Sequence, residues 1–390
     1  MESKNELRRS YFDSVSTIVA TDWNTVNNNQ NIYLSLPYLQ AIESALNHEM
    51  EFRYILFYDK NNKPVGIAVA QLVQFIDKGS EYYGHLCNFS NQIKNKIVQS
   101  LNIKVLVCGN VFACGENGFV FSNELTDEQV YDNLQEGLNQ LSKSDNIKKQ
   151  TSLILFKEFW QSNATKSDLL KQHHYHDFMI DVNMVLTIKK DWNALDIYLA
   201  NMVAKFRTKA NSVLKKSTPL IKKNMDLAAI IQQKDRVEEL YNMVLSKSDF
   251  SIGVLNAQAF INLKEQLGDQ FILNGYFLND KLIGFSSAFW FDNIIDANYV
   301  GIDYQYNVEY STYQRMLYDF VGIAIEKNAT EIRYGRTAEE IKSCLGAKPV
   351  SMKLYIKHKN SVSNKLLKAL IKTITPTAYE IRKPFKAAVV

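Results

Sequence analysis

Residues 334–349 read YGRTAEEIKSCLGAKP and form the most distinctive stretch of this sequence. The order of residue types predicts a strand that ends on Gly335, then a short helix, then a glycine that stops the helix. Thr337 is placed to cap the helix, and Glu340 follows three residues later, where its side chain can reach back to the cap. Gly346 suits the left-handed conformation that commonly follows a helix.

Two basic residues in this stretch are candidates for binding an anion. Arg336 stands at the end of the predicted strand, and Lys342 follows within the predicted helix. Both side chains could face a phosphate or a carboxylate. The alternative is that they form structural ion pairs with Glu339 or Glu340.

Strands and helices alternate on both sides of this stretch. Strands are predicted at residues 52–58, 64–76, 103–108, 151–156, 271–277, 282–291, 294–302, 331–334 and 350–357. Helices are predicted at residues 36–46, 126–141, 256–267, 310–327 and 338–345. Short turns join several of the strands, so hairpins are interspersed with the helices. The pattern predicts a mixed α/β (α+β) fold.

The two halves of the chain contain a similar hairpin. Residues 57–66 (FYDKNNKPVG) resemble residues 275–284 (GYFLNDKLIG) if one gap is allowed, and a long apolar strand follows each of them. A repeat of this kind indicates two similar domains. The alternative is that any two hairpins look alike at this level. The seam is predicted after Ile188, where apolar residues at helical spacing over 195–214 indicate a long helix.

Basic residues are concentrated in two segments. Residues 201–223 contain six Lys and one Arg without an acidic residue, and residues 351–390 contain eight Lys and one Arg against a single Glu380. The whole chain has a net charge of only +4, so the remainder is acidic. Such segregation predicts that the basic segments meet an anionic substrate, carrier or membrane surface.

Composition narrows the classes of protein further. With 390 residues, 46% hydrophobic residues and only 15 Gly and 6 Pro, the chain is expected to form two or three folded domains. Its four cysteines form no CxxC pair, which indicates free thiols in a reducing compartment. We find no signal peptide at the start, and the apolar run at 66–76 is too short to span a bilayer. Residues 173–176 (HHYH) lack acidic or cysteine partners, so no metal site is predicted.

At this point the sequence resembles a known family. The pattern G-R-T-x-x-E-I-K-x-x-L-G-A-x-P at 335–349 is similar to the C-terminal signature of GNAT-superfamily proteins of the FemAB type, often labelled peptidoglycan-biosynthesis acyltransferases. The W…YL…R…KK opening of that domain resembles Trp192, Tyr198, Leu199, Arg207, Lys215 and Lys216, and its end resembles Tyr355 and residues 358–360 (HKN). The likeness covers residues 190–360 well, and the N-terminal half resembles the degenerate lobe that precedes this domain, with weaker motifs.

The resemblance implies two tandem GNAT-like lobes, each a mixed, largely antiparallel sheet flanked by helices. A degenerate lobe is expected at 1–188, an acyltransferase lobe at 189–360, and a basic helix and tail at 361–390. Family members move an acyl or aminoacyl group from a thioester or an aminoacyl-tRNA to an amine. A base takes a proton from the attacking ammonium, and backbone donors hold the developing oxyanion. No permanently bound cofactor is expected, and acyl-CoA, acyl-carrier protein or aminoacyl-tRNA would be the co-substrate.

One segment departs from the GNAT pattern. GNAT enzymes present a glycine-rich turn whose amides bind the pyrophosphate of coenzyme A, but the corresponding residues 303–312 read DYQYNVEYST and contain no glycine. Side chains there would obstruct a close approach of phosphate. The departure favours a donor that is held in another way, such as an acyl-carrier protein or a charged tRNA.

The resemblance also assigns candidate site residues. Asp296, Asn298 and Tyr299 lie on the strand that borders the acyl-transfer cleft in GNAT-like folds, with Asp296 as general base, and solvated strand residues are the alternative. Tyr310 and Tyr313 could line the acyl tunnel or donate to a leaving thiolate, or pack in the core. The expected catalytic residues are Asp296, Tyr299 and Tyr310. The expected substrate-binding residues are Arg207, Lys215, Asn298, Tyr313, Arg336 and Lys342, although a solvated basic face would also explain Arg207 and Lys215.

The basic tail has two interpretations. As a helix, residues 364–374 place Lys365, Lys368 and Lys372 on one face and leucine and isoleucine on the other, which suits a peripheral contact with an anionic membrane. The alternative is a helix packed on its own protein. The protein is expected in the cytoplasm, with the inner membrane face as a site of peripheral association.

The first functional hypothesis is an N-acyltransferase or aminoacyltransferase that acts on the amine of an anionic cell-envelope precursor or lipid. The second is a non-catalytic GNAT-like protein that binds a ligand or an envelope partner, since the glycine-rich turn is missing. A third is an RNA-binding factor that uses the two basic segments. No DNA partner is predicted.

Overall fold

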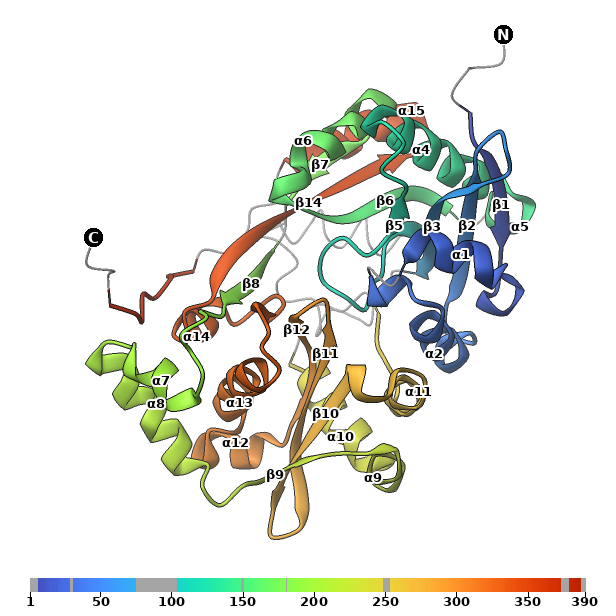
Figure 1. Cartoon of the computed structure of the whole chain (residues 1–390). Helices are drawn as coiled ribbons and strands as arrows, with labels where there is room; N and C mark the ends of the chain where they lie inside the picture. Colours follow the sequence, from blue (N-terminus) through green and yellow to red (C-terminus); the bar gives the residue numbers. More distant parts are fainter. Residues whose placement is uncertain are drawn as a thin grey trace. The chain divides into compact units, whose positions relative to one another are not determined.

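The computed structural model describes residues 6–28, 31–74, 104–148, 151–179, 181–247, 253–372 and 379–386. The chain divides into two compact units. The N-terminal unit comprises Met1–Asp181, Asp249–Leu255 and Ser351–Thr377, and the C-terminal unit comprises Val182–Ser248, Asn256–Val350 and Ala378–Val390. The units are therefore interleaved along the chain, as the colours in Figure 1 show, whereas the sequence predicts consecutive lobes.

The N-terminal unit is built on one mixed sheet. Its strands are β1 (Arg8–Phe12), β2 (Glu51–Tyr58), β3 (Pro64–Gln74), β4 (Lys104–Cys108), β5 (Phe119–Phe121), β6 (Thr151–Trp160), β7 (His176–Phe178) and β14 (Lys348–His358), the last of which begins in the C-terminal unit. The order is β1-β2-β3-β4-β6-β14, with β5 also on β3 and β7 also on β14. Among the described strands of this unit, β4 and β6 pair in parallel, and the other pairs named here are antiparallel.

Helices flank this sheet. They are α1 (Ala20–Asn27), α2 (Leu36–Leu46), α4 (Asp127–Lys143), α5 (Asp145–Lys148), α6 (Ala164–Ser167) and α15 (Ser361–Ile371), with 3-10 turns at Val15–Thr17, Ile32–Leu34, Gln161–Asn163 and Asp168–His173. Side chains cap two of these helices at their N-termini. Ser35 caps α2 by accepting a hydrogen bond from the Tyr38 amide, and Thr126 forms a capping box with Gln129 at the start of α4.

The C-terminal unit repeats the plan. Its strands are β8 (Val182–Thr187), β9 (Ile221–Asn224), β10 (Phe271–Leu278), β11 (Lys281–Phe291), β12 (Ile294–Ile302) and β13 (Glu331–Arg333), in the order β8-β13-β12-β11-β10-β9. Its helices are α7 (Leu195–Ala200), α8 (Ala204–Lys216), α9 (Leu227–Gln232), α10 (Lys234–Leu245), α11 (Ala257–Leu267), α12 (Tyr304–Tyr310), α13 (Thr312–Glu326) and α14 (Glu339–Ser343), with a 3-10 turn at Gly268–Gln270. Again one pair, β12 with β13, is parallel and the rest are antiparallel.

The two sheets correspond strand by strand. β1, β2, β3, β4 with β5, β6 and β14 occupy the positions that β9, β10, β11, β12, β13 and β8 occupy in the other sheet. This correspondence confirms the predicted duplication and the predicted mixed, largely antiparallel sheets. The hairpin glycines also correspond, and each is closely surrounded. A Cβ at Gly66 would lie 2.3 Å from the Phe121 ring, and one at Gly284 would lie 2.7 Å from Met316 Cε.

Both sheets are irregular at the same position. In the C-terminal unit Ser286 pairs with Val300 and Ala288 with Ala297, so two residues of β12 oppose the single residue between them, Ser287. In the N-terminal unit Ala68 pairs with Phe119 and Ala70 with Cys108, so the residues from 109 to 118 form a loop opposite Val69. Counted from the hairpin glycine, Val69 and Ser287 are equivalent. One copy therefore has a β-bulge where the other has an inserted loop.

A buried ion pair holds this loop. Lys157 and Glu158 are about 5% exposed or less, and the Lys157 ammonium lies 2.7 Å from Glu158 Oε2. Lys157 also donates to the Ala113 carbonyl, and Glu158 accepts from the Gly115 amide at 2.9 Å. The loop therefore has fixed contacts at the end of the parallel pair β4–β6.

Two predicted helices are interrupted in the structure. The helix predicted over 195–214 breaks between α7 and α8, where Met202 forms a β-bridge with Phe385 and the Val203 amide donates to the Pro384 carbonyl at 2.8 Å. The helix predicted over 310–327 begins instead as α13 at Thr312. The residue before it, Ser311, has φ 51°, and the preceding residues form α12 where the sequence predicts a loop.

The predicted cap of the short helix in the 334–349 stretch is wrong. α14 begins at Glu339, its cap position is Ala338 with φ 53°, and no side chain caps it. Thr337 has φ 61°, so it lies in a left-handed turn before the helix and not at the cap position. Gly346, by contrast, has φ 95°, which agrees with the predicted left-handed position.

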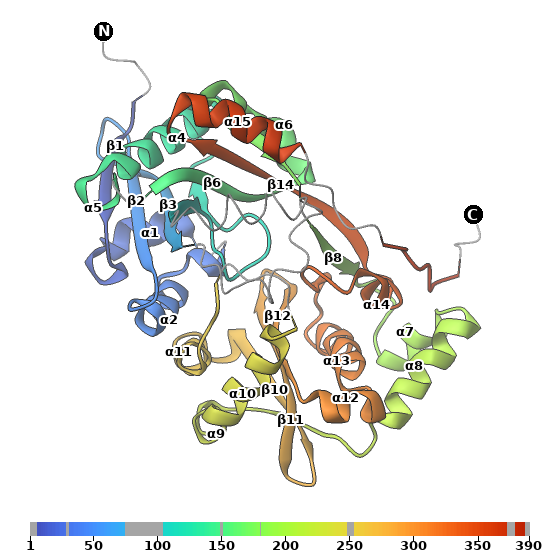
Figure 2. The ribbon, with the colours of Figure 1, turned by 180° about the vertical axis from the view of Figure 1, so that it is seen from behind.

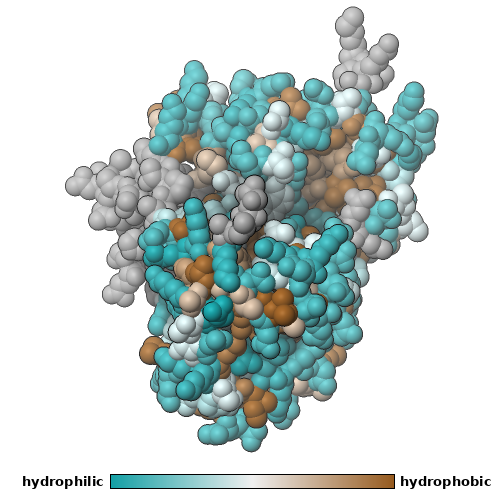
Figure 3. Space-filling model, turned by 60° about the vertical axis from the view of Figure 1, so that its left-hand side comes forward, coloured by the Kyte–Doolittle hydropathy of each residue, from teal (hydrophilic) through white to brown (hydrophobic). Residues whose placement is uncertain are grey.

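The described residues on one face of the molecule are mostly polar (Figure 3). On the face shown in Figure 3, hydrophilic side chains cover most of the surface and hydrophobic ones appear between them. Within the part of the chain that the structure describes, no helix combines the length and the hydropathy that crossing a bilayer requires.

The predicted strand at 64–76 is described as far as Gln74, and Cys87 lies outside the described residues.

A charged network fixes the end of β14 in the N-terminal unit. The Tyr355 hydroxyl donates to Asp168 Oδ1 at 2.7 Å, and the ammonium groups of Lys353 and Lys171 lie 2.9 and 3.0 Å from the same oxygen. Partial burial alone would raise the pKa of Asp168, but these hydrogen bonds outweigh it and lower the pKa to about 2.

We expect Asp168 to contribute to acid stability. Its folded pKa lies below the unfolded value of about 3.9, so its contribution is present above pH 4 and is lost as the pH falls toward 2. The Asp168→Asn variant should therefore melt below the wild type at pH 6, and the difference should shrink as the pH falls from 4 to 2. Differential scanning calorimetry over that range measures it, and a difference that does not depend on pH would contradict the assignment.

Candidate functional site

The candidate site lies where the parallel strands of the C-terminal unit part. β12 and β13 pair only over Ile294–Asp296 and Glu331–Arg333. β12 then continues to Ile302, while the chain after Arg333 turns toward α14. Asp296 is thus the last residue of β12 that pairs with β13, and its side chain is completely buried. The sequence-predicted base stands at the point of divergence.

A β-bulge follows directly. Asn298 and Tyr299 together oppose Ser287, whose hydroxyl donates to the Tyr299 carbonyl and accepts from the Tyr299 amide, both at 3.1 Å. A bulge redirects the backbone groups and the side chains of its strand. The Tyr299 ring packs edge-on against Tyr241 and Phe260, with centroids 5.9 and 5.7 Å away. The Ser287 hydroxyl therefore holds the backbone of the bulge, and aromatic packing holds the Tyr299 side chain.

The end of β13 contributes a loop with an unusual backbone. Gly335, Thr337 and Ala338 all have positive φ, which is costly for the two residues that carry a Cβ. The Gly335 amide donates to Asn183 Oδ1 at 3.0 Å, and a Cβ at Gly335 would lie 3.8 Å from the Ala297 carbonyl. The loop is thereby fixed beside the strand that carries Asp296.

Lys342 stabilises the same loop through hydrogen bonds to its backbone. Its side chain is nearly buried, and its ammonium donates to the carbonyls of Gly335 and Arg336. A buried ammonium needs such partners, because desolvating a charge without them is costly. Lys342 thus orders the loop, and Arg336 is half-buried within it.

The junction between α12 and α13 differs from the turn expected of a coenzyme A site. Asn307 Oδ1 accepts a hydrogen bond from the Tyr313 amide at 3.0 Å, in the first turn of α13. Asp303 caps α12 and pairs with Arg236 at 2.7 Å. The Asn307 side chain therefore already accepts the hydrogen bond of an amide in the first turn of α13. The amides of a first turn are the groups with which helix N-termini bind anions.

The two candidate tyrosines have different surroundings. Burial strongly raises the pKa of Tyr313, and the neighbouring Tyr304 and Glu339 raise it further, so the phenol stays protonated. Glu339 begins α14, which places Tyr313 near the 334–349 stretch. Tyr310 is the last residue of α12, half-buried, with its ring 6.4 Å from that of Tyr306.

The basic helix α8, which carries Arg207 and Lys215, contacts α12 and α13. Arg207 Nη1 donates to the carbonyls of Ala200 and Met202 at 3.4 and 3.3 Å, which closes the end of α7. Lys215 is exposed at the end of α8. Among the described residues, no hydrogen bond or ion pair joins Arg207 or Lys215 to Asp296.

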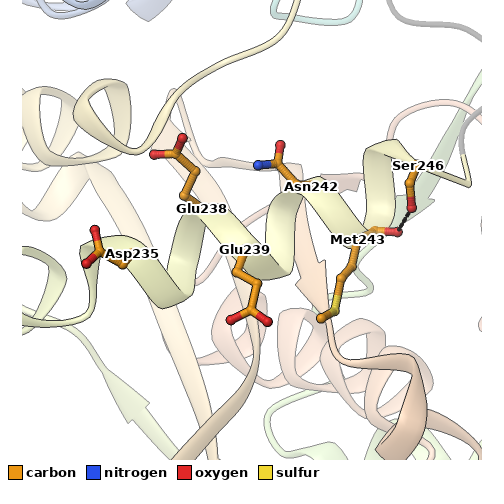
Figure 4. Close-up of a pocket in the computed structure, with 6 residues that line it drawn as sticks. All are labelled: Asp235, Glu238, Glu239, Asn242, Met243 and Ser246. Carbon is orange, nitrogen blue, oxygen red and sulfur yellow. Dashed lines mark hydrogen bonds between the residues drawn. The ribbon is translucent and has the colours of Figure 1, made fainter.

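One surface groove was not predicted and carries no site. Asp235, Glu238, Glu239, Asn242 and Met243 of α10 line it, together with Ser246 directly after the helix, as Figure 4 shows. Glu239 already pairs with Arg236 at 2.7 Å. Separately, among the described residues, no cluster of three His, Cys, Asp or Glu side chains is placed to hold a metal ion.

Sequence reasoning missed Ser287 and Asn183, which hold the bulge and the loop. Both are buried polar residues on strands, and buried polar groups need hydrogen-bond partners. The pair Ser286-Ser287 within an otherwise apolar strand is a signal that could have pointed to the bulge. The signal for Asn183 is weaker, because a single polar residue at a strand start is common.

Solved structures match this chain, whereas no family model and no curated protein does. FemX aligns over 92% of this chain and 100% of its own, with 12% identity and a TM-score of 0.57. A tandem GNAT protein from the clavulanic acid biosynthesis pathway aligns over 91% of this chain and 99% of its own, with 9% identity and a TM-score of 0.53.

A third match is the C-terminal domain of an Agrobacterium fabrum protein described as a lysylphosphatidylglycerol synthetase. It aligns over 90% of this chain and 96% of its own, with 7% identity and a TM-score of 0.50. At these identities the matches establish the fold. The chain has the tandem GNAT fold that its resemblance to FemAB-type proteins predicts.

Proposed function

We propose that the protein is an N-acyltransferase or aminoacyltransferase that moves an acyl group from a thioester or aminoacyl donor to an amine of a cell-envelope precursor or lipid. The observation that carries the proposal is the end of the parallel pair β12–β13 at the buried Asp296, followed at once by the bulge opposite Ser287. Its occurrence in a fold shared with FemX and a tandem GNAT protein supports acyl transfer.

The reaction needs few groups. The amine nitrogen forms a bond to the acyl carbon, and the bond from that carbon to the donor sulfur or oxygen breaks. In our proposal Asp296 accepts the proton that the amine loses, and the leaving group is protonated by Tyr313 or Tyr310. Tyr313 suits this donor role because its buried phenol keeps its proton. Asn298 and Tyr299, which form the bulge, would position the acyl carbonyl.

The α12–α13 junction supports a donor other than acetyl-CoA. Asn307 already occupies the Tyr313 amide, and residues 303–312 contain no glycine that would let a pyrophosphate approach the backbone. An acyl-carrier protein or a charged tRNA carries its acyl group far from most of its own surface. The rest of the carrier can therefore bind to the protein at a distance from the reacting atoms. We therefore assign one of these as donor.

For the acceptor we assign Arg336 as the contact to an anionic group, because guanidinium binds phosphate and carboxylate well. Lys342 is a positioning residue that keeps the loop of Arg336 in place through its two carbonyl bonds. Arg207 and Lys215 are proposed to meet the more distant charges of the acceptor or the carrier.

A donor panel tests the proposal. Acetyl-CoA, a long-chain acyl-CoA, an acyl-carrier protein loaded with labelled palmitate, and total tRNA charged with labelled amino acids are each added to the protein. We expect the carrier protein or the charged tRNA to raise the melting temperature by several degrees, as binding to the folded state requires. The same donor should transfer label to an extract of lipids and envelope precursors.

Uncharged tRNA and unloaded carrier protein are the matched controls. They separate recognition of the carrier from recognition of its acyl group. A panel in which no donor shifts the melting temperature and none transfers label would overturn the proposal. Acetyl-CoA as the best donor would instead overturn the role given to Asn307.

A further inference from the structure

A second cavity lies in the N-terminal unit, within which all of its lining residues fall. Its volume is about 920 Å³, and four segments line it: the end of α4, the stretch from Lys171 to Asp177, the end of β14, and α15. Figure 2 shows α15 beside β14, and Figure 1 shows the same neighbours from the other side. Cavities of this size hold small ligands.

The lining of the cavity is strongly basic. Three histidines also line it, and among the described lining residues Asp177 is the only one with a carboxylate. The lysines of the lining are Lys143, Lys171, Lys357, Lys359, Lys365, Lys368 and Lys372. Lys171 is neutralised by Asp168 and Asp177, at 3.0 and 3.1 Å. Among the described residues, none of the other six lysines has a carboxylate within ion-pair distance.

Two of these ammonium groups are fixed in place. Lys359 donates to the Ser142 carbonyl at 2.9 Å, and Lys357 donates to the His173 carbonyl at 3.3 Å. Burial lowers the pKa of both lysines. Glu136 opposes this shift at Lys357, whereas Lys143 adds to it, and Lys148 and Lys143 lower the pKa of Lys359 further. The protein thus holds several like charges close together with little compensation, which costs stability.

The walls of the cavity are tied to one another by Asn364 of α15. Its side chain accepts from the His358 amide and donates to the His174 carbonyl, both at 2.9 Å, and its own carbonyl lies 3.0 Å from His176 Nε2. Asn364 and Ile371 are buried, so the described part of α15 packs on its own unit. Residues 373 and 374 of the predicted amphipathic helix lie outside the described residues.

We infer that this cavity binds a compact anion that carries two or more phosphate groups. A monoanion would leave most of the six lysines uncompensated, whereas a polyphosphate places several charges within one cavity. Lysine ammonium groups are compact point charges suited to phosphate oxygens. The site is separate from the acyl-transfer site and stands whether or not the proposed function is correct.

The phosphate groups could belong to a soluble molecule or to a lipid headgroup. Val362 and Leu366 of α15 are 66% and 68% exposed, on the same helix as Lys365 and Lys368. Exposed apolar residues beside lysines are also found where proteins touch anionic bilayers. The recognised chemistry is the same in either case, and the experiment separates the two sources.

The test is calorimetric titration of the full chain with sodium tripolyphosphate, at constant ionic strength. The pocket variant replaces Lys143, Lys365 and Lys368 with Gln, and the control variant replaces Lys60, Lys190 and Lys348, three exposed lysines outside the cavity, in the same way. Both variants lose the same charge and alter only surface side chains. We expect the pocket variant to bind about tenfold more weakly or worse, and the control variant to bind like the wild type.

A second arm identifies the source. Phosphatidylcholine vesicles with and without cardiolipin, whose headgroup carries two phosphates, are sedimented with the protein in the presence and absence of tripolyphosphate. Binding that needs the anionic lipid and is displaced by tripolyphosphate supports a headgroup, and tripolyphosphate binding without vesicle binding supports a soluble ligand. Equal weakening in both variants, equal binding of orthophosphate, or binding of long RNA alone would overturn the inference.

Discussion

The Asp296→Asn variant should lose acyl transfer by a factor of about 10² to 10⁴ in kcat, which is the usual contribution of a general base. The amide has the shape of the carboxylate but cannot accept the proton of the attacking amine. Asn keeps the size and shape of the buried Asp296 side chain, so the isosteric change should leave the melting temperature within a few degrees of the wild type. Transfer of label from the donor found in the panel measures the rate.

A matched control is available on α13. Asp319 is also nearly buried, and both of its carboxylate oxygens lie 3.0 Å from Arg315 Nε. Asp319→Asn should lower the unfolding free energy, because it weakens a buried ion pair, but leave kcat unchanged below the melting transition. The acid limb of the pH–rate profile should disappear only in Asp296→Asn. A variant that retains both rate and profile would show that Asp296 is structural.

The Gly346→Ala variant should lose about 3 kcal/mol of unfolding free energy. Gly346 has φ 95°, where a Cβ is strained, and a Cβ there would lie 2.1 Å from the Phe385 ring. That ring stacks between Trp192 and Tyr198, with centroids 5.1 and 5.7 Å away, so it cannot move without disturbing the cluster. Urea unfolding measures the loss.

Two controls isolate the causes. Gly322→Ala is the same chemical change inside α13, where a Cβ meets nothing within 4 Å, and it should stabilise the protein by about 0.5–1 kcal/mol. Adding Phe385→Leu to Gly346→Ala should recover part of the loss by relieving the clash. If the double variant is as unstable as the sum of the two single changes, the contact with Phe385 is not the cause.

Local patterns predicted most of the regular elements. β12 runs over Ile294–Ile302 and α2 over Leu36–Leu46, as predicted, because strand alternation, the Ser35 cap and the early Pro37 are all local signals. The repeated hairpin predicted the duplication for the same reason. The end of the short helix at Gly346 was likewise predictable from one residue, since glycine alone takes this backbone conformation freely.

Predictions were wrong where distant residues decide. The break between α7 and α8 depends on Phe385, about 180 residues later in the chain, which pairs with Met202. No local pattern in 195–214 announces that partner. Similarly, the basic tail predicts an amphipathic helix but not a cavity, because the walls come from segments that lie far apart in sequence. Contacts of that range are invisible to periodicity.

For the candidate site, the sequence predicts which strand carries the polar groups but not how they are held. Asp296 and the bulge residues lie at the divergence of the strands, whereas the hydroxyl of Ser287 and the amide of Asn307 became evident only from their hydrogen bonds. Whether the six expected contacts bind substrate stays a prediction.

The interleaving of the two units bears on how the chain is made. β14, which pairs with β6 in the N-terminal unit, consists of residues 348–358, whereas the other strands of that unit end by residue 178. During translation the first unit therefore exposes the edge of β6 until residues 348–358 have left the ribosome. Unpaired strand edges invite aggregation, so the nascent chain should depend on chaperones more than its size suggests. For the same reason a fragment cut at residue 188 would lack a strand, and it would be a poor candidate for separate expression.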